Sequence, residues 1–265
     1  MTRNIKLYTL SVLIFLILLG LSTVEGIVGA LCYPLAFILP TVGLLLITKK
    51  DEKHPLAPTA SRALLLPLTA PTLLIIFGTA YLTAFLLYSA VGAENSVQVT
   101  GNLVFDIFTL AVAPAILEEL LFRYIPLKMI APYSKKTALL ISSLFFALVH
   151  SSLFSIPHAF LAGVIFMTAD LAVGSPLPSV ILHLLNNLVS VAWEYAYPTG
   201  YAHLIPIALG AAALLSTVFI IIKKEDYKKA AKEIFKKEDK AALPAFTLSL
   251  AIPTIGAAIL ELIGK

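Results

Sequence analysis

Residues 7–48 read LYTLSVLIFLILLGLSTVEGIVGALCYPLAFILPTVGLLLIT, and they decide the fold class. Two apolar segments, residues 7–24 and 27–48, meet at Glu25, which is the only charged residue of the stretch. Each segment is close to the roughly 20 apolar residues that a helix needs to cross a bilayer. The stretch therefore predicts two membrane-spanning helices joined by a short turn.

The same apolar pattern continues along the rest of the chain. Further apolar segments cover residues 63–90, 102–122, 137–153, 158–174, 178–197 and 203–222, with a weaker one at 243–263. Of the 265 residues, 59% are hydrophobic and 13% are charged, and the mean hydropathy is +0.95. A soluble domain has about 25% charged residues, so the composition argues against a soluble enzyme or a disordered chain. We expect an all-α, polytopic bundle of about eight transmembrane helices, with residues 1–265 forming one integral-membrane domain.

The basic residues predict how the chain is oriented in the membrane. Of the 19 Lys and Arg residues, 18 lie in residues 1–6, 49–62, 123–136 and 223–240, and the loops on the opposite side contain none. Basic loops stay in the cytosol, so the N-terminus is expected to be cytoplasmic. Because topology accounts for the positive charge, nucleic-acid binding is not predicted. The 223–240 segment is read either as a basic amphipathic helix on the inner membrane surface or as a solvated linker.

Ionisable groups inside apolar segments are costly, so each one is a candidate for function. The first group is Glu118-Glu119-Leu-Leu-Phe-Arg123, at the inner end of segment 102–122. Glu119 and Arg123 are four residues apart and share a helix face, whereas Glu118 points about 100° away. This spacing predicts an ion pair between Glu119 and Arg123 beside a carboxylate that is available as a base. The alternative is that all three mark a helix end at the headgroups.

Two further patterns lie in later segments. Phe146 and His150 are four residues apart, as are His183 and Asn187. A carboxylate base, a water-orienting imidazole and two hydrogen-bond donors for an oxyanion together fit peptide hydrolysis by an activated water. The alternative for each pattern is a packing histidine or a polar contact between helices. Neither Cys32 nor any serine has a base at a recognisable spacing, so a covalent nucleophile is not predicted.

The three motifs, in this order on separate predicted helices, resemble the CAAX-protease and bacteriocin-processing (Abi) family, which includes the Ras-converting type of prenyl-protein endopeptidase. The similarity covers about residues 102–197. It implies an intramembrane endopeptidase that removes the last three residues of a Cys-a-a-X terminus once the cysteine is lipidated. The implied partners are an isoprenylated protein or peptide and membrane lipids. Glu119 and Arg123 would position the catalytic base, Glu118, or the substrate tail.

The resemblance also implies roles for the other motif residues. Glu118 would be the general base and His150 its partner in activating water, while His183 and Asn187 would form the oxyanion site. Glu118, His150 and His183 are also residue types that bind catalytic zinc. The compact His-Glu-x-x-His metalloprotease signature is absent, so we favour a mechanism without a metal and keep zinc as the alternative cofactor.

Two other functions remain open at this stage. Asp106 and Asp170 lie in separate apolar segments and would suit a proton or cation path in a transporter. A non-catalytic member of the same family, acting as an immunity or scaffold protein that binds a peptide, is the other alternative.

Overall fold

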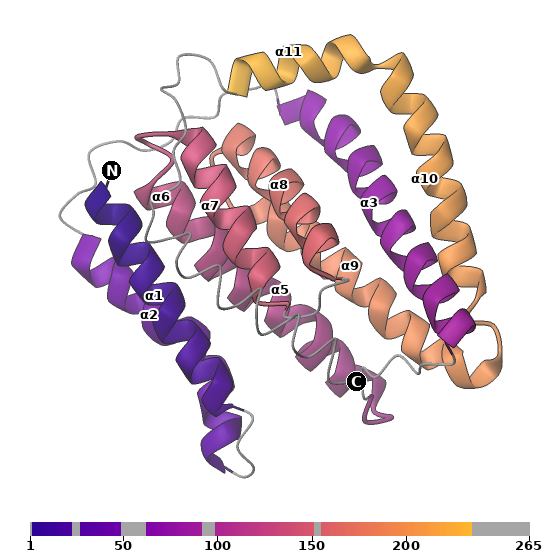
Figure 1. Cartoon of the computed structure of the whole chain (residues 1–265), viewed down its shortest axis with the longest axis horizontal. Coiled ribbons are helices and arrows are strands. Elements are labelled where there is room, and N and C mark those ends of the chain that lie inside the picture. Colours follow the sequence, from indigo (N-terminus) through magenta and orange to yellow (C-terminus); the bar gives the residue numbers. More distant parts are fainter. Residues whose placement is uncertain (1, 23–26, 49–61, 92–98, 151–154, 235–265) are drawn as a thin grey trace. The chain divides into compact units, whose positions relative to one another are not determined.

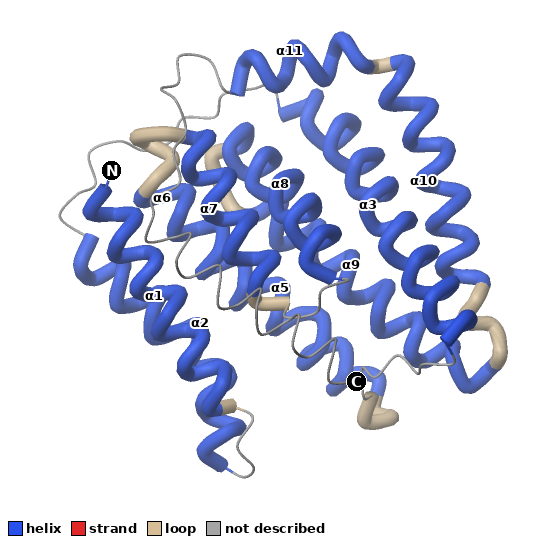
Figure 2. The backbone as a smooth tube through the Cα atoms, viewed as in Figure 1, coloured by secondary structure: helices blue, strands red, loops and turns tan. Residues whose placement is uncertain are grey.

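The computed structural model describes residues 2–22, 27–48, 62–91, 99–150 and 155–234 (Figure 1). These residues form helices and loops, and none of them lies in a strand (Figure 2). The expected all-α class is therefore confirmed.

Each of the eight stronger apolar segments coincides with helical structure. Seven of them become the single helices α1 (Thr2–Leu21), α2 (Ile27–Thr48), α3 (Arg62–Val91), α7 (Lys135–Leu148), α8 (Ser155–Val173), α9 (Leu177–Ala196) and α10 (Leu204–Ile222). Segment 102–122 becomes a run of α-helical and π-helical pieces: α4 (Leu103–Asp106), η2 (Ile107–Val112), α5 (Ala113–Glu119), η3 (Leu120–Tyr124) and α6 (Ile125–Met129). The short helix η4 (Tyr197–Thr199) follows α9, and α11 (Lys224–Ile234) forms the first part of the basic segment. Residues 235–240 and the segment 243–263 lie outside the described residues.

Three of the described helices are long and apolar enough to cross a membrane. They are Arg3–Leu21, Ser155–Val173 and Leu204–Ile222, and shorter apolar helical stretches cover Leu31–Ile47 and Thr69–Leu82. The last long helix, α10, exposes Leu214 and Leu215, which are 72% and 74% accessible. Acyl chains are the natural cover for such side chains, and the chain is an integral membrane protein. The total of eight crossings remains a prediction.

The chain divides into two compact units. Unit 1 takes in the described residues of Met1–Thr59, Leu117–Ser179 and Ile234–Lys265, and unit 2 those of Ala60–Ile116 and Val180–Glu233. The divisions fall inside α5, α9 and α11.

Unit 1 has an aromatic core. The ring centroid of Phe15 on α1 lies 4.7 Å from that of Phe37 on α2 and 5.5 Å from that of Phe122 on η3. Phe146 on α7 lies 6.1 Å from Phe122 and 6.1 Å from Phe166 on α8. All five side chains are buried. These edge and tilted ring contacts join five elements of the unit, with Phe122 and Phe146 at the centre.

Unit 2 depends on the close approach of α3 and α10, which run side by side (Figure 1). At Gly78 of α3, an added Cβ atom would lie 2.4 Å from the carbonyl oxygen of Leu209 and 2.7 Å from Cβ of Ala213. The two backbones therefore touch at this point, as small residues allow in membrane helices. Tyr81, one turn further along α3, hydrogen-bonds Ser190 of α9.

Replacing this glycine tests the α3–α10 contact. Gly78→Ala is expected to lower the free energy of unfolding by about 1–3 kcal/mol, because the two backbones must separate. Gly43→Ala is the matched control, since a Cβ there meets nothing within 4 Å and alanine is the better helix former by about 0.5–1 kcal/mol. The measurement is thermal or denaturant unfolding in detergent. Equal stabilisation by both substitutions would contradict the contact.

Candidate active site

The first motif contains a buried ion pair. Glu119 ends α5, Arg123 lies in the π-helical turn η3, and both side chains are completely buried. Nε of Arg123 lies 3.3 Å from Oε2 of Glu119, which confirms the pair expected from the four-residue spacing. Glu118 is the adjacent residue and is half-buried. The two neighbouring carboxylates thus have different surroundings, and the arginine is paired with the second.

Aromatic rings surround the guanidinium group of Arg123. Its Cζ atom lies 4.1 Å from the ring centroid of Phe146 and 5.4 Å from that of Phe166. A flat, weakly hydrated guanidinium group suits this stacking better than an ammonium group does. The rings and the carboxylate of Glu119 together explain how an arginine side chain is accommodated without solvent.

His150 lies beyond the end of its helix, where the sequence predicted a helix through residue 153. The backbone N–H of His150 donates to the carbonyl of Ala147 (3.2 Å), a tighter turn than the α-helical one. In a continuing α-helix, the N–H of His150 would donate to the carbonyl of Phe146. Here Nδ1 of the His150 imidazole lies 2.8 Å from that carbonyl oxygen. The described helix ends at Leu148, and residues 151–153 of the predicted segment lie outside the described residues.

This hydrogen bond sets the chemistry of the histidine ring. A carbonyl only accepts, so Nδ1 carries the hydrogen and Nε2 holds the lone pair of the neutral ring. The ring of Phe146 lies edge-on to that of His150, with centroids 4.8 Å apart. Phe146 thus contacts Arg123 with one face, and it orients His150 through both its ring and its carbonyl. The sequence analysis used Phe146 only to mark the motif and missed this connecting role.

The third motif lies on α9. His183 is buried and Asn187 is half-buried, and their spacing puts both on one helix face. Nδ2 of Asn186 donates to Oδ1 of Asn187 (3.3 Å), so the amide hydrogens of Asn187 remain its donor groups. Inside unit 1, the structure brings the first and second motifs together. His183 and Asn187 belong to unit 2.

Residues 100–189, about a third of the chain, match a protein-family model described as type II CAAX prenyl endopeptidase Rce1-like. This segment contains all three motifs. Over this segment the chain is similar to the Rce1-like family. No curated protein and no solved structure matches it. The match confirms the family resemblance drawn from the motifs.

The two aspartates that suggested an ion path have hydrogen-bond partners within the chain. Asp106 accepts from the backbone N–H and the hydroxyl of Thr100 (3.0 and 2.8 Å) and from the hydroxyl of Tyr195 (2.7 Å). Asp170 accepts from the backbone N–H of Ser179 (3.0 Å). These contacts favour structural roles for both carboxylates.

Metal ligands are not gathered in the part of the chain that the structure describes. No group of three or more His, Cys, Asp or Glu side chains is placed there so as to hold a metal ion. The zinc set considered from the sequence draws Glu118 and His150 from unit 1 and His183 from unit 2. Metal dependence is a matter for a chelator experiment.

Removing Arg123 tests the importance of the buried pair. Arg123→Ala is expected to lower the free energy of unfolding by about 3–5 kcal/mol, because Glu119 keeps a buried charge without its guanidinium partner. Lys228→Ala is the control: its 2.8 Å pair with Glu225 is exposed to solvent, and such pairs contribute little. Unfolding in detergent gives both values, and similar small effects would contradict the role assigned to the pair.

Proposed function

We propose that the chain is an intramembrane endopeptidase that hydrolyses a peptide bond with a water activated by Glu118 and His150. The observation that carries the proposal is the chain of contacts from the Glu119–Arg123 pair through Phe146 to His150. It lies inside the segment that matches the Rce1-like family. These contacts orient Glu119, which is next to the proposed base Glu118. They also orient the ring of His150, the proposed partner.

The chemistry follows from the groups available. The carboxylate of Glu118 takes a proton from the water while Nε2 of His150 accepts a hydrogen bond from it, and the water oxygen attacks the carbonyl carbon. His183 and Asn187 donate hydrogen bonds to the oxyanion that forms. The carbon–nitrogen bond then breaks, and Glu118 returns its proton to the leaving amine. Glu119 and Arg123 hold the base in place.

The proposed substrate is an isoprenylated protein or peptide that ends in Cys-a-a-X, from which the last three residues are released. The isoprenoid would remain among the acyl chains while the peptide enters from the cytosolic side. The basic loops support this orientation, since their Lys and Arg residues predict a cytosolic N-terminus and a cytosolic inner end of segment 102–122.

Loss of the base or its partner is the direct test. Glu118→Gln and His150→Ala are each expected to lower kcat at least about 100-fold, since each removes a group that handles the proton of the water. The assay uses purified protein in detergent and a fluorogenic farnesylated Cys-a-a-X peptide. Asp106→Asn is the matched control and should keep wild-type cleavage, because that carboxylate is bonded to Thr100 and Tyr195.

Further arms of this assay separate the alternatives. Wild-type activity in both variants would contradict the assignment of base and partner. A wild type that binds the peptide without cleaving it would favour the scaffold reading. We expect a chelator to leave kcat unchanged, and a loss that added zinc restores would overturn the mechanism without a metal.

The oxyanion site makes a separate prediction. His183→Ala and Asn187→Ala are each expected to lower kcat about 100- to 1,000-fold with a smaller change in KM, because an oxyanion donor acts chiefly in the transition state. The same peptide assay measures both constants. Asn186→Ala serves as the neighbouring comparison and should cost less than Asn187→Ala. The reverse order would assign the donor to Asn186.

A further inference from the structure

Asp170 bonds to the chain on both sides of the turn between α8 and α9. Its carbonyl accepts from the backbone N–H groups of Gly174 (2.6 Å) and Ser175 (3.3 Å) and so ends α8. Gly174 has a φ of 75°, the left-handed conformation that commonly closes a helix. The Oδ1 atom of the same aspartate accepts from the N–H of Ser179, in the first turn of α9.

The first turn of α9 has few other acceptors for its amides. The leading N–H groups of a helix have no partner within the helix. Leu177 donates to Oγ of Ser175 (3.3 Å), and Pro178 has no N–H group. Ser179 donates to Asp170, so the carboxyl oxygen of a side chain on the preceding helix serves as a cap.

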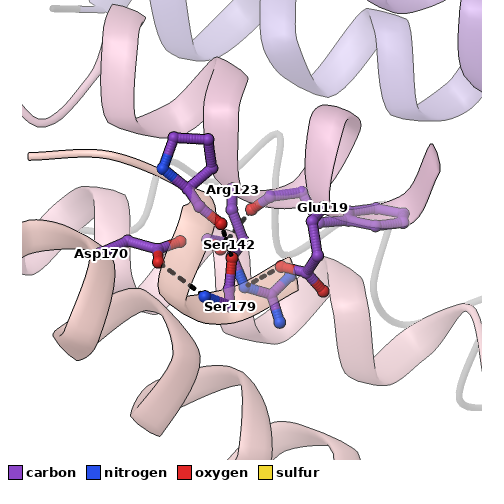
Figure 3. A network of polar contacts seen from close by, with 7 residues as sticks. Glu119, Arg123, Ser142, Asp170 and Ser179 are labelled. Carbon is purple, nitrogen blue, oxygen red and sulfur yellow. Dashed lines mark hydrogen bonds and ion pairs between the residues drawn. The ribbon is translucent and has the colours of Figure 1, made fainter. Parts of the chain in front are cut away.

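The same carboxylate belongs to the polar network of the first motif. Asp170, Glu119 and Arg123 are all completely buried. Figure 3 shows the Glu119–Arg123 pair and the Asp170–Ser179 bond in one close-up of unit 1. The start of α9 is thus bonded to a buried carboxyl group that lies near the ion pair.

The helix that starts here carries the third motif on the same face. Ser179, His183 and Asn187 follow one another at four-residue spacing, and each step advances about 6 Å along the axis. The capped amide is therefore one turn before the first proposed oxyanion donor. A displacement of about 1 Å at a reacting group costs on the order of 100-fold in rate.

We propose that Asp170 is a positioning residue: it caps the first turn of α9 and thereby orders the helix that carries His183 and Asn187. This inference rests on the proposed peptidase function. Asp170 lies outside the three motifs, and its role is to accept the Ser179 amide.

The test compares Asp170→Ala with Asp170→Asn, which keeps an Oδ1 acceptor. Asp170→Ala should lower kcat about tenfold, with KM within about twofold of wild type, because donor placement changes and substrate binding does not. Asp170→Asn should restore kcat to within about threefold of wild type, since its amide oxygen still caps the helix. Thr168→Ala is the matched control on α8, because that hydroxyl donates within its own helix to the carbonyl of Val164 (2.7 Å).

Amide hydrogen exchange of the first two turns of α9 supplies a readout that does not require cleavage. Exchange should be faster in Asp170→Ala and unchanged in Asp170→Asn and Thr168→Ala. Unchanged kcat and exchange in Asp170→Ala would overturn the proposal. An equal loss of kcat in Asp170→Asn would also overturn the proposal, because the charge of the side chain would then matter and its acceptor oxygen would not.

Two further outcomes are also decisive. If the wild type cleaves no peptide, the proposed function fails, and the exchange measurement alone decides whether Asp170 holds α9. If Asp170→Ala does not fold, Asp170→Asn carries the test, and a tenfold loss of kcat in that folded variant overturns the proposal.

Discussion

The buried pair of Glu119 and Arg123 is the constraint on which the rest of unit 1 depends. Burying two charges is costly, and removing the partner of either one is more costly still. The guanidinium group also needs flat apolar cover, which Phe146 and Phe166 supply from two other helices. Because Phe146 also orients His150, the pair and the imidazole cannot be placed independently of each other.

The π-helical turn η3 contributes to the same arrangement. A π turn bonds each carbonyl one residue further along than an α turn does, and such turns occur frequently at functional sites. Ser142 of α7 donates to the carbonyl of Phe122 within η3, so a side chain of one helix bonds the irregular backbone of the other. The position of α7 relative to the first motif is thereby fixed by a polar contact as well as by aromatic packing.

The sequence predicts the helices and the Glu119–Arg123 pair because both depend on local spacing. Apolar length identifies a helix, and a four-residue separation identifies a shared face. The end of α7 was not predictable in this way, since the imidazole of His150 takes the carbonyl that would have continued the helix. The ion path was considered as an alternative for Asp170 because the partner of this residue, the Ser179 amide, is reached across a turn. Periodicity carries no information about such a contact.

These cases share a physical cause. Membrane-spanning helices satisfy their own backbone groups, so unpaired amides and carbonyls occur where a helix ends or changes its winding. Glu119 lies at the end of α5, His150 follows α7, and Asp170 bonds to both sides of the α8–α9 turn. The imidazole of His150 and the carboxyl group of Asp170 satisfy backbone groups at such positions. This explains why these two polar residues lie at helix ends and away from the middle of regular helices.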